Sequence, residues 1–224
     1  MSAERSDEPV APNPRTLRGR RAIARADDQT AYRDRRREVV DIAARLFREK
    51  GYDTTTFADI AREFGTDRAS LYYYVTSKQE LFEEIVGGIL DGNVTEAERI
   101  LASDDDAPAK LRLLIEDQIE TQARNYPHMY VYIQDGMRAV RDRQSEWARR
   151  MSAQTSRYER IVRQILLDGV REGSIRSDID VRLLGAGLFG LMSWTHRWFR
   201  PGDPFSPQEV AASIVGIFLE SATS

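Results

Sequence analysis

Hydroxyl, guanidinium and phenol groups lie close together in the sequence between residues 55 and 73. Hydroxyl groups can donate hydrogen bonds to phosphate oxygens, and a guanidinium can pair with the edge of a guanine base. Arg68 is therefore the expected reader of bases, and Tyr73 is expected to pack on a thymine methyl group or to reach a phosphate. The residues that could make such contacts are Thr55, Thr56, Arg68, Ala69, Ser70 and Tyr73.

The residue patterns on which most enzymes and metal sites depend are absent. The chain has no cysteine, and its two histidines, His128 and His196, are 68 positions apart. This excludes disulfides, thiol chemistry, and zinc or iron–sulfur sites built on cysteine. The motifs Gly-x-Ser-x-Gly and His-Glu-x-x-His and the Walker loop do not occur. We expect no catalytic residue, no metal and no cofactor.

The first element that positions these side chains is a short helix expected over 57–64. Thr56 and Asp59 have the spacing of a capping box, in which each side chain bonds the other residue's backbone N–H. Gly65 provides a stop signal, because glycine readily adopts the left-handed conformation that follows a helix. The apolar residues of this segment recur at helical spacing, so one side of the helix should face a core.

A second short helix is expected over 68–75, with Asp67 as its N-cap. Two short helices joined by a glycine-containing turn form a helix-turn-helix. The outer side of the second helix has small or polar residues, so it can enter a major groove. On its inner side we expect Leu71, Tyr72 and Val75 to face the core.

The charge distribution is uneven along the chain. Residues 15–78 contain 15 Lys/Arg and 10 Asp/Glu, whereas 79–224 contain 17 Lys/Arg and 23 Asp/Glu. A basic front on an acidic body is typical of nucleic-acid binding, although a solvated charged face is the alternative. Residues 1–30 have few large apolar side chains, so we expect a disordered basic arm. The arm either visits a minor groove or is an inert leader.

A longer pattern of residues surrounds the two short helices. It consists of Phe47, Gly51, Tyr52, Thr55, Thr56, Phe57, Ile60, Ala61, Gly65, 71–75 and 77–81. In order and spacing, without a gap, this pattern resembles the DNA-binding domain of TetR-family transcriptional regulators. The chain departs from the family at Thr66, where an apolar residue is usual, at Asp67, where serine is common, and at Ala69, where glycine is common.

The resemblance implies two further phosphate contacts, from Tyr74 and Lys78. Ser77 should cap a longer helix that begins at Lys78. A positive charge at a helix N-terminus is unfavourable for the helix dipole. A bound phosphate would offset that penalty.

The rest of the chain also has helical periodicity, so the sequence predicts an all-α protein of about nine helices. Breaks near 103–108, 125–127, 173–178 and 201–204 separate the predicted helices. Those helices lie near 79–101, 108–124, 128–140, 144–172, 180–199 and 207–221. The expected domains are the arm over 1–30, a helix-turn-helix domain over 31–78 and a ligand-binding and dimerisation domain over 79–224.

The last two long helices are the predicted dimer interface. In the family they pair with their symmetry mates into a four-helix bundle, and a helix-turn-helix that reads a palindrome needs two copies. The alternative is that their apolar stripes belong to the core of a single chain. The candidate interface residues are Leu184, Leu188, Leu191, Thr195, Trp198, Val210, Ile214, Ile217 and Phe218.

The helices over 108–172 should enclose a regulatory cavity, as the resemblance implies. The candidate lining residues are Ile119, Gln122, Met129, Ile133, Met137, Trp147, Met151, Thr155, Tyr158 and Trp194. Because these are mostly apolar and aromatic, we expect a hydrophobic effector. The run 194–202 looks like a subgroup that includes repressors relieved by acyl-CoA thioesters. With the arginines over 138–163 it favours an acyl-CoA or a bulky apolar acid, and a neutral aromatic effector is the alternative.

These features predict a homodimeric repressor that binds a palindromic operator on double-stranded DNA and responds to a small hydrophobic molecule. An effector that binds better to a form with misplaced recognition helices would lower operator affinity. No uncharged apolar run of 18 residues occurs, so we expect a cytoplasmic protein without a membrane partner. The alternatives are a helical scaffold and, least favoured, an enzyme, and neither would give a site-specific band in a gel shift.

Overall fold

The computed structural model describes residues 17–126, 128–129 and 146–223, and throughout these ranges the regular secondary structure is helical. The predicted all-α fold class is confirmed. The helices are α1 (Leu17–Lys50), α2 (Phe57–Phe64), α3 (Arg68–Leu71), α4 (Lys78–Leu101), α5 (Ala107–Arg124), α7 (Glu146–Glu172), α8 (Val181–Trp194), the 3-10 helix η1 (Thr195–Arg197) and α9 (Pro207–Ala222). Most of the helix predicted near 128–140 lies outside the described residues. None of the described helices has the length and apolar character that crossing a bilayer requires.

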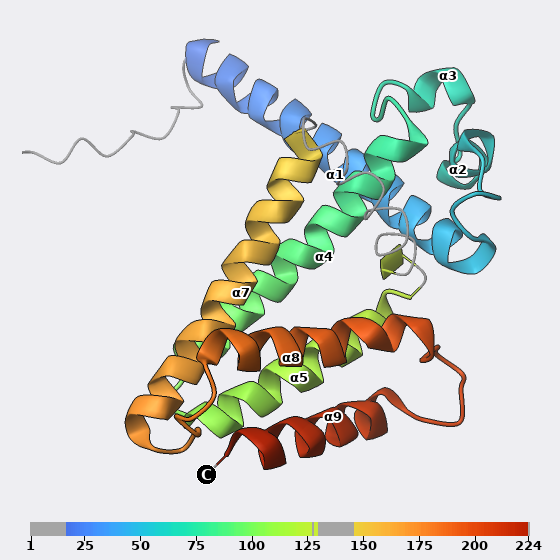
Figure 1. Ribbon diagram of the computed structural model, residues 1–224. Helices are drawn as coiled ribbons and strands as arrows, with labels where there is room; N and C mark the ends of the chain where they lie inside the picture. Colours follow the sequence, from blue (N-terminus) through green and yellow to red (C-terminus); the bar gives the residue numbers. More distant parts are fainter. Residues whose placement is uncertain (1–16, 127, 130–145, 224) are drawn as a thin grey trace, which may run out of the picture.

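The helices form two groups that are joined by two long helices (Figure 1). At one end, α2 and α3 lie against α1 and the beginning of α4. At the other end, α5, α8 and α9 pack together. The helices α4 and α7 lie side by side and connect the two ends. A change in the position of either long helix therefore reaches both groups.

Each group has its own hydrophobic core. The first core contains buried side chains of α1, α2, α3 and the first part of α4, together with Met151 of α7. The second core is built from the later part of α4 and from α5, α7, α8 and α9. The predicted domain boundary at residue 78 coincides with the start of α4. Because Leu81, Phe82 and Val86 are buried in the first core, that core extends about two turns into α4.

The structure differs from the sequence prediction at the beginning of the first helix. Residues 17–30, which were expected to be disordered, belong to α1. This segment is rich in arginine and alanine, which have high helix propensity. It also continues a helix whose later residues, such as Val39 and Phe47, are buried, and adding a residue to an existing helix is easier than starting one. Residues 1–16 lie outside the described residues.

The start of α2 and its end follow the sequence signals. The Thr56 Oγ1 atom accepts a hydrogen bond from the Asp59 backbone N–H at 3.1 Å, and the Asp59 carboxylate accepts one from the Thr56 N–H at 3.0 Å. This confirms the predicted capping box. Gly65 follows with φ of 77°, a left-handed conformation that glycine adopts without strain.

The helix α3 begins where expected and ends early. The Asp67 side chain accepts the Ser70 backbone N–H at 2.7 Å, as an N-cap should. The helix ends at Leu71, whereas the sequence predicted helix to residue 75. The Tyr73 N–H bonds the Ser70 carbonyl and the Tyr74 N–H bonds the Leu71 carbonyl, and such three-residue spacings tighten the chain into turns.

Candidate nucleic-acid interface and effector cavity

The outer side of α3 is open to solvent. Arg68, Ala69 and Ser70 are exposed, and the Tyr73 side chain is 70% exposed. The first three belong to α3, whose N-terminus is fixed by the Asp67 cap and whose Leu71 is fully buried, and Tyr73 lies in the turn that follows the helix. This combination leaves the four predicted reading side chains available on a firmly held backbone.

Tyr72 differs from its predicted place in the core. Leu71 and Val75 are buried as expected, but Tyr72 is 48% exposed. Its ring lies 4.8 Å from the ring of Phe57, and its hydroxyl accepts a hydrogen bond from Arg68 Nη2 at 3.3 Å. The early end of α3 turns this side chain away from the core. Tyr72 therefore helps to hold the Arg68 guanidinium in place through this hydrogen bond. Helical periodicity did not indicate this role.

The two threonines before α2 have different environments. Thr55 is buried, and its hydroxyl lies 2.8 Å from the Gly51 carbonyl and 3.2 Å from the Leu46 carbonyl, so its one proton is shared between these two internal acceptors. Its predicted phosphate contact is corrected to an internal role, because the hydroxyl points into the domain. Thr56 is exposed, and its hydroxyl donates to the Asp59 carboxylate at 2.6 Å. Hydrogen bonds from the Thr56 hydroxyl and N–H, with one from Arg62, lower the pKa of Asp59 to about 2.

Lys78 contacts the protein's own backbone. Its Nζ donates to the carbonyls of Tyr52 at 2.8 Å, Thr55 at 3.1 Å and Asp53 at 3.4 Å, and it lies 4.3 Å from the centre of the Tyr52 ring. The three carbonyl oxygens stabilise the Lys78 ammonium group. They can therefore offset its unfavourable interaction with the α4 dipole without a bound phosphate. The ammonium group holds the loop before α2 against α4.

Tyr74 is half-buried and packs within the domain. Its ring lies 5.4 Å from Phe64 and 5.6 Å from Tyr32, in edge-on and stacked arrangements respectively. The resemblance implied a phosphate contact for Tyr74. In the structure its ring joins α1 to the end of α3.

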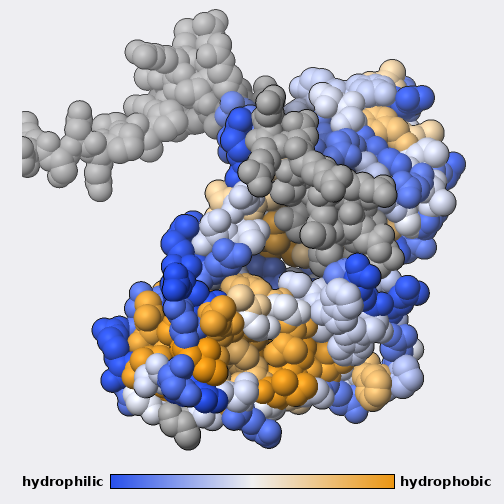
Figure 2. All heavy atoms as spheres, in the orientation of Figure 1, coloured by the Kyte–Doolittle hydropathy of each residue, from blue (hydrophilic) through white to orange (hydrophobic). Residues whose placement is uncertain are grey.

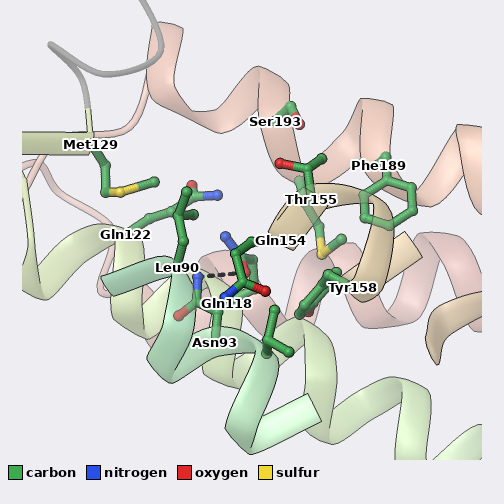
Figure 3. A pocket seen from close by; sticks show the side chains of 12 residues that line it. Leu90, Asn93, Gln118, Gln122, Met129, Gln154, Thr155, Tyr158, Phe189 and Ser193 are labelled. Carbon is green, nitrogen blue, oxygen red and sulfur yellow. Dashed lines mark hydrogen bonds between the residues drawn. The ribbon is translucent and has the colours of Figure 1, made fainter. Parts of the chain in front are cut away.

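A cavity of about 160 Å³ lies beside the second core (Figure 3). It lies between α4, α5, α7 and α8, and Met129 also reaches it. The described residues that line it are Leu90, Asn93, Val94, Gln118, Gln122, Met129, Gln154, Thr155, Tyr158, Phe189, Met192 and Ser193.

Four of the ten residues predicted to line a cavity do so: Gln122, Met129, Thr155 and Tyr158. Ile119 and Met151 are fully buried in the second and first cores, and the Nε1 of Trp147 donates to the Glu83 carbonyl at 3.3 Å. Trp194 is 58% exposed. The remaining two, Ile133 and Met137, lie outside the described residues.

The cavity lining is more polar than the sequence predicted. It includes the carboxamides of Asn93, Gln118, Gln122 and Gln154, of which only Gln122 was expected. The missed signal is the spacing of Gln118 and Gln122, which puts two amides on one side of α5, one turn apart. None of the described lining residues is charged.

Hydrogen bonds orient all four of these amides, and that of Gln154 is donated by its Nε2 to the Asp91 carboxylate. The Asn93 Nδ2 donates to Gln118 Oε1 at 3.3 Å, and the Thr195 hydroxyl donates to Gln122 Oε1 at 2.7 Å. The Tyr158 hydroxyl is buried and has no hydrogen-bond partner among the described residues. Burial raises the pKa of Tyr158 well above its usual range, so the phenol is a neutral donor at physiological pH.

The second group also has an apolar outer surface on α8 and α9. Figure 2 shows apolar side chains gathered over these helices. Leu183 is 68% exposed and Ile217 is 60% exposed, and Trp194 also faces solvent. Gly187 and Gly190, on the same side of α8, have open space beside them. We call Leu183, Gly187, Gly190, Trp194 and Ile217 the outer α8–α9 face.

Most of the predicted dimer residues are buried within the chain and do not belong to this outer face. Leu191 is half-buried, and only Trp198 and Ile217 are exposed. The structure corrects the other six, which are buried in the chain's own core, the alternative that the sequence left open. They are Leu184, Leu188, Thr195, Val210, Ile214 and Phe218.

An exposed helix-turn-helix at one end and a cavity between helices at the other are typical of regulators that couple DNA binding to a small molecule. Comparison with known proteins gives the family. A family model described as bacterial regulatory proteins, tetR family, matches residues 39–85, and one described as tetracyclin repressor-like, C-terminal domain, matches 104–222. The chain belongs to the TetR family of transcriptional regulators, which are not enzymes.

Individual relatives agree with this assignment. The chain is 32% identical over 199 residues to the HTH-type transcriptional repressor KstR2 of Rhodococcus jostii, covering 89% of this chain and 96% of the relative. The structure of the ketosteroid transcriptional regulator KstR2 of Mycobacterium tuberculosis is similar with a TM-score of 0.72 at 27% identity, covering 85% of this chain and 95% of that one. The TetR-family regulator PfmR of Thermus thermophilus gives a TM-score of 0.70 at 32% identity, covering 81% and 97%.

Proposed function

We propose that the protein is a repressor that binds a palindromic operator as a homodimer and releases it when a small molecule occupies the cavity. The observation that carries the proposal is the exposed, capped face of α3. Arg68 can pair with guanine, and Tyr73 can contact a thymine methyl group or a phosphate. The site of action would be the cytoplasm, where a bacterial operator is found.

The homodimer would form through the outer α8–α9 face. Exposed Leu183, Trp194 and Ile217 provide apolar area, and large exposed apolar patches mark interaction sites. Gly187 and Gly190 would let two helices approach closely. Two chains related by a twofold axis through this face would present two copies of α3, one for each half of a palindromic operator.

The effector response would pass through α4 and α7, because both helices contact the cavity and the first core. On α7, Tyr158 lines the cavity, whereas Met151, two turns earlier, is buried in the first core. On α4, Asn93 lines the cavity and Leu81 is buried in the first core. A molecule that binds a shifted arrangement of these helices would reduce operator affinity by its difference in affinity for the two arrangements.

The effector would be a small molecule with a largely apolar body. Leu90, Val94, Phe189 and Met192 support this proposal from the cavity wall. The acyl-CoA thioester or apolar acid suggested by the 194–202 resemblance is one candidate, and the description of the M. tuberculosis relative as a ketosteroid regulator suggests a second, steroid-like one. Titrating the operator complex with a long-chain acyl-CoA, its free acid, CoA alone and a ketosteroid separates these candidates.

Selection of bound sites from random double-stranded DNA, followed by gel shift, tests the proposed function. We expect an enriched palindrome and one shifted band whose stoichiometry, measured by sedimentation, is a multiple of two chains. Leu183→Glu should separate the dimer and weaken operator binding. If no sequence is enriched over random DNA at low salt, the protein is not a sequence-specific repressor.

A further inference from the structure

The beginning of α1 has a high density of positive charge. Residues 17–26 contain four arginines and no acidic residue, although the whole chain has a net charge of −3. Because α1 begins at Leu17, these arginines belong to a helix. A helix holds its residues at fixed spacings, so the positions of the arginines around α1 can be compared with those of residues further along it.

Three of these arginines occupy one side of α1. Positions 18, 21 and 25 are three and four residues apart, and residues at those spacings are neighbours on a helix surface. The same side continues, at spacings of seven and four residues, to Tyr32 and Arg36. We call Arg18, Arg21 and Arg25 the basic side of α1.

The contacts of Tyr32 and Arg36 show which way this side of α1 faces. The Tyr32 ring lies 5.4 Å from the Tyr73 ring and 5.6 Å from the Tyr74 ring, and its hydroxyl donates to the Tyr73 carbonyl at 3.5 Å. The Arg36 guanidinium pairs with Glu80 of α4 at 2.9 Å. The side that continues into the basic side therefore faces the turn after α3 and the beginning of α4.

The beginning of α1 also projects beyond the first group of helices. Figure 1 shows it at the same end of the molecule as α3, away from α5, α8 and α9. At about 1.5 Å per residue, position 18 lies about 21 Å along the helix axis from Tyr32. A DNA duplex has a phosphate charge about every 1.7 Å of its length. A duplex that is bound by α3 and Tyr73 would therefore bring phosphates close to the basic side.

The protein itself does not balance this charge in the way that it balances neighbouring arginines. Arg35 pairs with Glu38 at 2.7 Å, and Arg36 pairs with Glu84 at 2.6 Å. In contrast, the first ten residues of α1 contain no carboxylate. Arg21 and Arg25 are four residues apart, and like charges at that spacing destabilise a helix. A polyanion that binds both would offset this repulsion.

We propose that the basic side of α1 binds phosphates of the DNA duplex beside the bases that α3 reads. The contact is made by an ordered helix, and it carries no base preference because phosphates are the same in every sequence. The proposal rests on the DNA binding proposed above and deepens it by adding a second surface to the DNA interface.

The test compares the full wild-type chain with a variant in which Arg18, Arg21 and Arg25 are all changed to alanine. Alanine has the highest helix propensity, so the helix should persist. The probes are the selected operator and a duplex of unrelated sequence and equal length. The slope of log affinity against log salt should fall by about 0.9 for each lost phosphate contact, or about 2.7 for each chain, on both duplexes. Base preference should not change.

Two controls separate the basic side from total charge. Arg20→Ala removes an arginine of the same segment that lies off this side, so the slope should change less than in Arg21→Ala. A second triple alanine variant removes the same charge from exposed positions of α7 and α8 and should leave the slope unchanged. Its substituted residues are Arg160, Arg163 and Arg182. An equal fall in slope in either control overturns the proposal.

Ala24→Pro tests whether the contact needs a helix. The variant keeps all four arginines, but proline lacks the N–H and clashes with the carbonyl four residues earlier, so it breaks the helix. We expect the slope to fall as in the triple variant, and the thermal midpoint shows that the rest of the chain still folds. A wild-type slope in Ala24→Pro would show that a flexible arm suffices and would overturn the proposal.

The result is distinguishable from failure of the proposed function. If the operator is bound and the triple variant keeps the wild-type slope, the phosphate contact fails and the repressor stands. If no operator is enriched but the slope on the unrelated duplex falls as expected, the phosphate contact stands and the repressor fails. Binding to phosphatidylserine vesicles that needs these arginines, with an unchanged slope on DNA, would assign the basic side to a lipid surface and overturn the proposal.

Discussion

The helix-turn-helix and the α8–α9 region are both built from short amphipathic helices, yet their sequences predict their structures unequally well. In the helix-turn-helix, Thr56, Gly65 and Asp67 have the roles in the structure that their positions indicate. In α8, the sequence predicted that the face containing Leu188 would contact a second chain. In the structure, Leu188 is buried in the core of its own chain.

The two regions differ in how far apart in the sequence the residues that determine each feature lie. A cap depends on residues three positions apart, so its partners are visible in the sequence. The inward face of α8 depends on which side meets α5, α7 and α9, and the residues of those helices lie many more than four positions from their partners in α8. Leu183 and Leu184 are adjacent, and a rotation of about 100° around the helix exchanges them.

The largest expected effect tests the orientation of α8. Leu188→Ala should destabilise the protein by about 2–5 kcal/mol, because it leaves a hole in a packed core. Urea-induced unfolding at several protein concentrations measures this cost and separates folding from association. The matched control is Leu183→Ala on the exposed side of the same helix, where we expect a change within about 0.5 kcal/mol in the folding part. Equal costs at both positions would mean that the orientation is wrong.

Much of the fold could be predicted from the sequence, since apolar periodicity and caps mark most helix ends. Ser77 caps α4 and Ser206 caps α9, in agreement with the expected starts of those helices. The extent of α1 could not be predicted, because a segment of weak apolar character becomes helical when it continues a stable helix.

Less of the candidate site could be predicted, because a side chain's type does not reveal its partners. Lys78 has a positive charge that could bind a phosphate, and the Tyr52 carbonyl that accepts a hydrogen bond from its Nζ is 26 positions away. Gln118 and Asn93 are of residue types that are usually found on protein surfaces. Only the packing of α4 against α5 shows that they border a cavity.

The second prediction concerns base reading by α3. Arg68→Ala should weaken operator binding by about 1–3 kcal/mol and relax base preference at one position in each half-site, because a guanidinium–guanine pair is lost. Gel shifts with single-base operator variants measure both effects. Arg182→Ala, an exposed arginine of α8 paired with Asp180, is the control and should leave DNA binding unchanged. Unchanged base preference in Arg68→Ala would show that another residue reads the operator.

The third prediction distinguishes the two roles for Lys78. If its main role is to hold the backbone carbonyls of the loop before α2, Lys78→Ala should cost about 1–2 kcal/mol of stability and leave the salt dependence of DNA binding unchanged. If the side chain binds a phosphate, the slope of log affinity against log salt should fall by about one unit. Lys110→Ala is the control, since its Nζ donates to a single helix-terminal carbonyl, that of Leu101, in the other domain. We expect a smaller loss of stability there and no effect on DNA.

The smallest expected effect compares two capping boxes, one in each region. Thr56 and Asp59 form the first at α2, and Ser206 and Glu209 form the second at α9. Hydrogen bonds from Thr56 and Arg62 lower the pKa of Asp59 to about 2, and hydrogen bonds from Ser206 lower the pKa of Glu209.

A carboxyl whose pKa is lower in the folded state stabilises that state above its unfolded pKa, which is about 3.9 for Asp and about 4.3 for Glu. This stabilisation is lost as the pH falls toward the folded pKa. Urea unfolding between pH 6 and pH 2 should therefore show Asp59→Asn and Glu209→Gln less stable than the wild type at pH 6, with both differences shrinking as the pH falls. Because a cap depends only on residues three positions apart, the two variants should behave alike in direction although they lie in different regions. A difference that persists undiminished at pH 2 would mean that the lost side chain acts through packing and not through its charge.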